Sequence, residues 1–197
     1  VYDGAEWVYV GGDFSRTGGV TAANTARYPP ITRNWEAIGG QLNGVVYALA
    51  ISGTDLYVGG NFANADGIAT ADYVAKYSTS GGTWASIGGQ LNSTVFALVI
   101  SGTDLYVGGQ FTNANGISTA DYVVKYSISG ATWASIGGQL NGYVRTFSFL
   151  DADLYVGGNF TNADGIATAD YVAKYTTSGG TWASIGGQLN TTVLTLA

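Results

Sequence analysis

Short stretches of apolar, β-branched and aromatic residues alternate with turn residues along the whole chain, and this pattern predicts strands. In the second copy of a recurring pattern, the predicted strands are residues 56–60, 73–77, 83–87 and 94–100. Between them, Asn64 to Gly67 carries turn chemistry and Ser80 to Gly82 predicts a tight hairpin. Residues 101–104 then turn the chain into the next copy.

The pattern recurs at an interval of 49 residues, as the tryptophans at positions 35, 84, 133 and 182 show. Gly-Gly doublets begin at positions 11, 59, 108 and 157, so only the first unit is one residue short. A period of roughly 20 to 50 residues indicates stacked or ring-shaped repeats. The four repeat units span approximately residues 1–51, 52–100, 101–150 and 151–197.

Four antiparallel strands per repeat, with short connections and no helical periodicity, predict an all-β fold of β-propeller blades. We predict a single β-propeller domain, or a propeller segment, over residues 1–197. Residues 193–196 are a candidate for the strand that the first unit lacks, which would close a ring of four blades. The alternative is that the four units belong to a larger ring of five to eight blades and are a piece of a longer chain.

Each repeat places apolar positions before the Gly-Gly doublet, then a tyrosine, and a tryptophan seven positions after the tyrosine. This order resembles the kelch repeat of galactose-oxidase-like β-propellers. The longer pattern, Leu-Tyr-Val-Gly-Gly-Asn-Phe and then Trp-Ala-Ser-Ile-Gly-Gly-Gln-Leu-Asn, is similar to repeats of large secreted bacterial surface proteins and of the fungal cortical polarity marker. The resemblance implies the fold of a β-propeller and carries no activity with it. The residues for which we expect structural roles are Gly59, Gly60, Gly108, Gly109, Gly157, Gly158, Tyr77, Trp84, Tyr126, Trp133, Tyr175 and Trp182.

Composition favours a turn-rich extracellular protein, because 46% of the residues are apolar, only 10% are charged and 31 are glycine. We therefore expect a secreted or cell-surface location. The net charge is −6, and 7 lysines and arginines provide no basic stripe for a phosphate backbone, so nucleic acid is not an expected partner. Apolar runs are too short to span a bilayer, so we expect no membrane insertion.

The chain has no cysteine, methionine or histidine, which removes thiol nucleophiles, imidazole bases and the usual zinc ligands. Copper chemistry of the galactose-oxidase type needs such residues too. The acidic residues recur in equivalent positions instead of forming one asymmetric pair. We therefore expect no catalytic residues, no metal, no cofactor and no enzyme activity.

Asn/Asp-rich turns recur once per repeat and resemble calcium loops superficially, but they lack the first aspartate and the acidic last ligand of such loops. A turn with glycine at positive φ is the preferred interpretation. Each repeated lysine, such as Lys76, is expected to pair with the aspartate four residues before it or to face solvent. The candidate ligand-binding residues are Asn64, Asp66, Asn113, Asn115, Asn162, Asp164, Gln90, Asn92, Gln139 and Asn141.

Near-identical repeats favour multivalent binding or a structural role over catalysis, because an active site needs one unit to differ from the rest. The first hypothesis is a non-catalytic surface module that binds protein or carbohydrate or forms a unit of a surface assembly. Self-assembly is part of that expectation. The alternative is a multivalent propeller lectin with one sugar site per blade.

Overall fold

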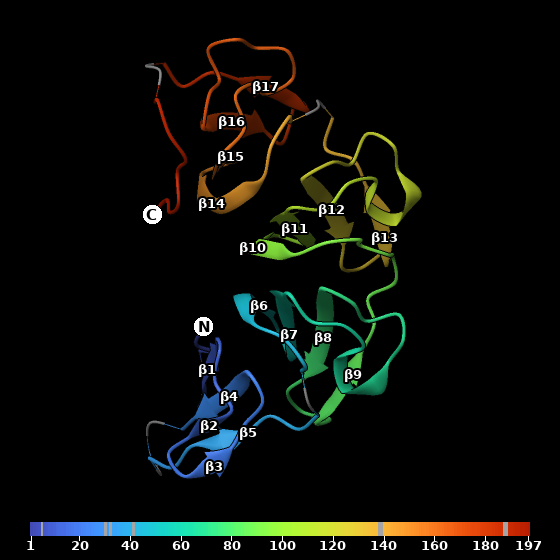
Figure 1. Ribbon diagram of the computed structural model, residues 1–197, viewed down its shortest axis with the longest axis vertical. Coiled ribbons are helices and arrows are strands. Elements are labelled where there is room, and N and C mark those ends of the chain that lie inside the picture. Colours follow the sequence, from blue (N-terminus) through green and yellow to red (C-terminus); the bar gives the residue numbers. More distant parts are fainter. Residues whose placement is uncertain (5, 30, 32, 41, 138–139, 187–188) are drawn as a thin grey trace. The chain divides into compact units, whose positions relative to one another are not determined.

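Antiparallel sheets recur along the chain in a computed structural model (Figure 1). The structure describes residues 1–197 except 5, 30, 32, 41, 138–139 and 187–188. The chain divides into two compact units, Val1–Gln90 and Leu91–Ala197, and each is described by itself.

The first unit contains a three-stranded sheet and a four-stranded sheet, together with a small hairpin. The three-stranded sheet has the order β1 (Val8–Gly11), β4 (Thr25–Tyr28), β5 (Glu36–Ala37), and the hairpin joins β2 (Arg16–Thr17) to β3 (Val20–Thr21). The four-stranded sheet has the order β6 (Val46–Ser52), β7 (Asp55–Gly60), β8 (Val74–Ser78), β9 (Thr83–Ala85). A short 3₁₀ turn, η1 (Ala65–Gly67), lies between β7 and β8.

The second unit contains two four-stranded sheets of the same design. One has the order β10 (Val95–Ser101), β11 (Asp104–Gly109), β12 (Val123–Ser127), β13 (Thr132–Ala134), with η2 (Ala114–Gly116) between β11 and β12. The other has the order β14 (Val144–Leu150), β15 (Asp153–Gly158), β16 (Val172–Thr176), β17 (Thr181–Ala183).

The strand that ends each sequence repeat begins the next sheet. β6 pairs with β7 through a hairpin in which Ser52 lies opposite Asp55, which leaves only Gly53 and Thr54 to make the turn. A two-residue loop of this kind fixes the pairing register locally. The sheets are therefore offset from the repeat units by one strand, although the strands themselves lie close to the predicted ranges.

The observed strands differ from the predicted ranges by one or two residues, and two of these differences have a clear local cause. β8 begins at Val74 and not at Tyr73, because Tyr73 has a φ of 62° and cannot continue an extended strand. β9 ends at Ala85, before Ser86, whose hydroxyl donates a hydrogen bond to the carbonyl oxygen of Thr70 at 2.7 Å. That side-chain contact replaces ladder pairing at this point.

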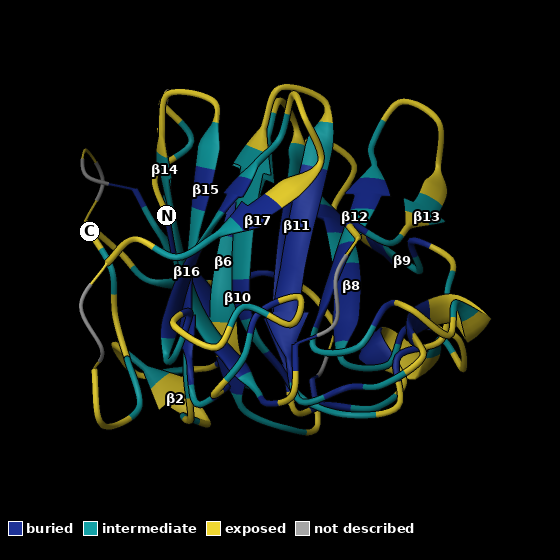
Figure 2. Ribbon diagram, turned by 90° about the horizontal axis from the view of Figure 1, so that it is seen from above, coloured by how far each residue is buried: buried dark blue, intermediate teal, exposed yellow. Residues whose placement is uncertain are grey.

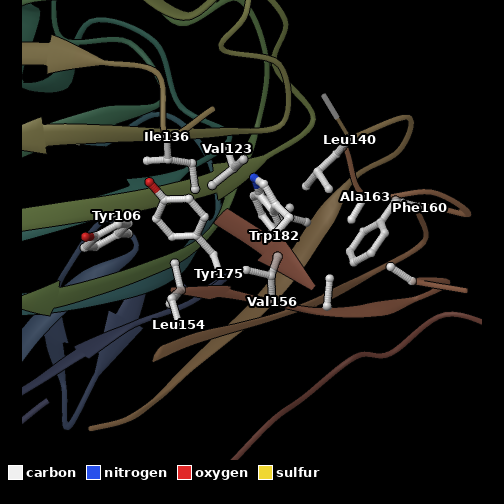
Figure 3. Close-up of a cluster of buried hydrophobic side chains, with 13 residues drawn as sticks. Tyr106, Val123, Ile136, Leu140, Leu154, Val156, Phe160, Ala163, Tyr175 and Trp182 are labelled. Atoms are coloured by element: carbon white, nitrogen blue, oxygen red, sulfur yellow. The ribbon is translucent and has the colours of Figure 1, made fainter. Parts of the chain in front are cut away.

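Buried residues concentrate in the second and third strands of the four-stranded sheets (Figure 2), and apolar residues of the loops and fourth strands complete the core of each unit. Figure 3 shows the cluster of the second unit, in which Tyr175 and Trp182 lie among Leu154, Val156 and Val123. The corresponding cluster of the first unit includes Tyr77 and Trp84. Tyrosine and tryptophan rings pair with their centroids 5.0–5.3 Å apart at Tyr28–Trp35, Tyr77–Trp84, Tyr126–Trp133 and Tyr175–Trp182.

The Gly-Gly doublets allow close approach of neighbouring backbone and side chains. A β-carbon at Gly60 would lie 2.1 Å from the carbonyl oxygen of Val45, and one at Gly158 would lie 2.0 Å from that of Tyr143. Neither glycine has a positive φ, so space and not backbone conformation excludes larger residues. The doublets Gly59–Gly60, Gly108–Gly109 and Gly157–Gly158 are all buried.

In one hairpin, a residue with a β-carbon has a backbone conformation that is unfavourable for it. Ala131, between β12 and β13, has a φ of 50°, whereas Gly82 and Gly180 occupy the equivalent positions with φ of 68° and 63°. We expect Ala131→Gly to raise the free energy of unfolding by about 0.5–1 kcal/mol, because an L-residue with a β-carbon is strained there. Chemical denaturation measures this change. Gly82→Ala and Gly180→Ala are the matched reverse substitutions, and equal stability of all variants would contradict the expectation.

Candidate functional site

The predicted ligand-binding residues that the structure describes gather at one end of the four-stranded sheets, which we call the turn end. It carries the connection between the second and third strands of a sheet and the loop that leads into its first strand. In the first unit, the backbone N–H of Ala63 donates to Asn43 Oδ1 at 2.8 Å and ties these two connections together. In the second unit, the N–H of Thr161 donates to Asn141 Oδ1 at the same distance.

The Asn/Asp turns have a left-handed backbone that their residues tolerate well. Asn64 and Asp66 have φ of 53° and 51°, and Gly67 follows with a φ of 79°. The positive φ of the glycine agrees with the predicted turn. Asparagine and aspartate adopt this region more readily than other non-glycine residues, which explains their recurrence here. The other two turns repeat the geometry at Asn113, Asn115, Gly116, Asp164 and Gly165.

In each of the first two turns, a second aspartate accepts a hydrogen bond from the backbone of the turn. Asp72 Oδ1 accepts the backbone N–H of Asn64 at 2.6 Å, and Asp121 Oδ1 accepts that of Asn113 at 2.7 Å. In the third turn, Asp170 Oδ1 is buried and has no hydrogen-bond partner among the described residues. Two of these carboxylates are thus engaged in holding the turn. Within the described residues, no group of three or more His, Cys, Asp or Glu side chains is placed to hold a metal ion.

The asparagines of the Gln-Leu-Asn loops also serve the local structure. Asn92 accepts the N–H of Thr112 at 2.9 Å and donates to its hydroxyl at 3.1 Å. Asn141 makes the same pair of contacts with Thr161, at 2.8 and 3.0 Å. Both amide groups are therefore occupied, although the residues are exposed. Gln90 is exposed, and Gln139 lies outside the described residues.

A different set of predicted residues is left with unengaged side chains. Asn64, Asp66, Asn113, Asn115 and Asp164 are exposed, whereas Asn162 is half-buried. In the part of the chain that the structure describes, the side chains of the five exposed residues make no hydrogen bond. These side chains are the polar groups that the turn end offers to a ligand.

A pocket of about 340 Å³ lies beside the first of these turns. Asp66 is the charged residue in its lining, and an added β-carbon at Gly40 would lie 2.9 Å from the Asp66 carboxyl carbon. The carboxylate therefore sits against the backbone of Gly40. The lining consists of Thr21, Ala22, Ala23, Thr25, Ala37, Gly39, Gly40, Asp66 and Gly67.

The sequence contains a signal for this pocket that motif analysis missed. The serine hydroxyls of the other three repeats donate to a threonine carbonyl, at 2.7–2.8 Å: Ser86 to Thr70, Ser135 to Thr119 and Ser184 to Thr168. The first repeat has Ala37 at this position, and alanine cannot make the contact. Ala37 instead forms part of the pocket wall.

The repeated lysines pair with aspartates, but not with those expected. Lys76 Nζ lies 2.9 Å from Asp55 on the neighbouring strand, and not beside Asp72. The prediction was wrong because Lys76 lies opposite Tyr57 in the antiparallel register, two residues from Asp55. Such half-exposed pairs contribute modestly to stability. Equivalent pairs are Lys125–Asp104 at 2.9 Å, Lys174–Asp153 at 2.7 Å and Arg27–Glu36 at 2.8 Å.

The shifted pKa values follow ion pairing and burial. A hydrogen bond from Lys174 holds the pKa of the Asp153 carboxyl below its usual value. Burial raises the pKa of Tyr106 to about 12 and also raises the pKa of Tyr175. These groups belong to strands and lie away from the turn side chains.

The structure resembles solved β-structures that share little sequence with it. The extracellular domain of BT4673 from B. thetaiotaomicron aligns with a TM-score of 0.63 and 12% identity over 97% of this chain, which spans 23% of that chain. The computationally designed Ika8 protein aligns with a TM-score of 0.54 and 14% identity, over 88% of this chain and 46% of the Ika8 chain. The designed Ika4 protein aligns with a TM-score of 0.51 and 14% identity, over 79% of this chain and 80% of the Ika4 chain.

The sequence comparison gives the family. No curated protein matches the chain. The family model described as the Rax2 C-terminal beta propeller domain matches residues 1–101 and 85–197, which together span the chain. Among the described residues, no helix has the length and hydropathy needed to cross a membrane. The four-stranded antiparallel sheets and the family match confirm the predicted β-propeller fold, and the chain belongs to the Rax2 C-terminal beta propeller domain family.

Proposed function

We propose that this β-propeller domain is a non-catalytic interaction module that works outside the cell or at its surface. Its partner is a protein or a carbohydrate bound at the turn end of the sheets. The observation that carries the proposal is the repeated set of exposed turn side chains that make no hydrogen bond within the described part of the chain, represented by Asp66, Asn115 and Asp164. Repeated weak contacts of this kind gain strength through avidity.

Other observations support the surface location and the absence of catalysis. The family is that of a propeller domain, and a similar fold occurs in the extracellular domain of BT4673. The chain has no histidine or cysteine, and its lysines are paired with carboxylates. The narrower likeness to kelch repeats and the capacity for self-assembly remain predictions.

The test is a glycan array and a pull-down from cell-surface extracts, each performed with the full chain. We expect a reproducible partner that is lost in the triple variant Asp66→Gly, Asn115→Gly and Asp164→Gly. Glycine keeps the positive φ of each turn and removes only the side chain.

The matched control removes exposed side chains at the other end of the same sheets. The variant Ser80→Ala, Ser129→Ala and Ser178→Ala changes the loops between the third and fourth strands. We expect it to bind like the unmodified chain. Binding lost equally in both variants, or no partner in either assay, would count against the turn end as the binding surface.

The pocket beside Asp66 favours a second candidate function, that of a lectin. About 340 Å³ is within the size range of small-ligand sites, and a carboxylate can accept hydrogen bonds from sugar hydroxyls. Isothermal titration with monosaccharides separates the two functions. One site per chain would indicate a lectin that uses this pocket, about one site per blade would indicate the multivalent lectin, and absence of heat with common monosaccharides would leave the interaction module.

A further inference from the structure

The chain contains three Asn-Gly pairs, Asn43–Gly44, Asn115–Gly116 and Asn141–Gly142. In such a pair, the backbone nitrogen of glycine can attack the side-chain carbonyl carbon of asparagine and release ammonia. The cyclic imide that forms is then opened by water at either carbonyl, which yields aspartate or isoaspartate. Glycine favours the attack because it has no side chain to hinder the approach.

Two of the three pairs are held in a way that opposes the reaction. Asn43 Oδ1 accepts the N–H of Ala63. The oxygen and the nitrogen of the Asn141 side-chain amide both form hydrogen bonds with Thr161. The glycines after them are packed: a β-carbon at Gly44 would lie 1.7 Å from the oxygen of Asn61, and one at Gly142 would lie 2.9 Å from that of Asn159. The attack needs room for the asparagine side chain to rotate, and these contacts remove it.

Asn115–Gly116 differs in each of these respects. Both residues are exposed, and the Asn115 side chain makes no hydrogen bond in the described part of the protein. Apart from its two chain neighbours and the backbone of its own turn, no described residue has an atom within 4 Å of a β-carbon added at Gly116. The attacking nitrogen donates to the carbonyl oxygen of Asn113 at 2.9 Å, so this one hydrogen bond must open first. It belongs to a three-residue 3₁₀ turn at the surface, where opening requires little free energy.

We propose that Asn115 is a site of spontaneous deamidation in the folded protein. The aspartate product would place at position 115 the residue that the other turns already have, as Asp66 and Asp164. Those residues have φ of 51° and 54°, close to the 52° of Asn115, so the turn accommodates aspartate without a change of backbone. The reaction adds one negative charge to a chain whose net charge is −6.

The proposal is tested by incubating the full chain in mildly alkaline buffer and mapping its peptides by mass spectrometry over time. We expect position 115 to gain about one dalton at a rate about tenfold or more above that of positions 43 and 141. Isoelectric focusing is expected to show one more acidic band. The band should be absent from Asn115→Gln.

The unfolded chain supplies the internal control. In denaturant, the protection of Asn43 and Asn141 is lost, so the three Asn-Gly pairs should convert at similar rates. The proposal is overturned if the folded protein converts position 43 or 141 as fast as position 115. It is equally overturned if position 115 converts in the denatured chain but not in the folded one.

Discussion

Replacing Trp84 with alanine is expected to lower the free energy of unfolding by about 3–5 kcal/mol. The Trp84 side chain is 7% exposed, and its ring packs at 5.3 Å from that of Tyr77. Its indole nitrogen donates to the carbonyl oxygen of Gly39 at 2.6 Å. The indole therefore links β9 to the loop that follows β5. Alanine would leave a cavity and a carbonyl oxygen without its donor.

The effect is measured by chemical denaturation followed by fluorescence and circular dichroism. Trp84→Phe is the control, since it keeps an aromatic ring and removes the donor, and we expect it to cost about 1–2 kcal/mol. Trp182→Ala repeats the test in the second unit, where the indole donates to Gly137 at 2.8 Å. A loss below about 1 kcal/mol for the alanine variants would show that these rings do not hold the sheets together.

Replacing Gly158 with alanine is expected to destabilise the protein by about 3 kcal/mol, more than most single substitutions do. The added β-carbon would lie 2.0 Å from the carbonyl oxygen of Tyr143 and 3.1 Å from the Val144 α-carbon. These are backbone atoms, so no side-chain rotation can make room. The clash is relieved only if β14 separates from β15.

The same denaturation experiment measures this loss, with Gly179→Ala as the matched control. Gly179 lies in the loop between β16 and β17 of the same sheet and has no positive φ, and its nearest contact for a β-carbon is 3.6 Å, to Thr181 Oγ1. We expect the control to stay within about 0.5 kcal/mol of the unmodified protein. Equal stabilities of the two variants would mean that the doublet does not need glycine for space.

The repeat made much of the fold predictable. Four tryptophans at one interval and the hairpin signal at Ser80 to Gly82 located the strands within one or two residues. The grouping of strands into sheets was less evident, because the sequence repeat has no natural starting point. The decisive clue was the two-residue loop at Gly53 and Thr54, which forces β6 to pair with the strand after it.

The candidate site was predicted less completely, because side-chain contacts between distant segments leave little trace in the sequence. Asn92 and Thr112 are twenty residues apart, yet their hydrogen bonds occupy an amide that appeared available for a ligand. Lys76 was assigned to Asp72 by its spacing, whereas the strand register brings it to Asp55. Ala37 lines the pocket and lacks the hydroxyl that the serines of the other repeats have, a difference that only a comparison of repeats could reveal.

The most direct measurement of the binding surface is hydrogen–deuterium exchange of the full chain with and without the partner that the array or pull-down identifies. The account predicts slower exchange, on binding, in the turns at residues 63–68, 112–117 and 161–166. Slower exchange confined to the opposite ends of the sheets, at residues 79–82, 128–131 and 177–180, would contradict it.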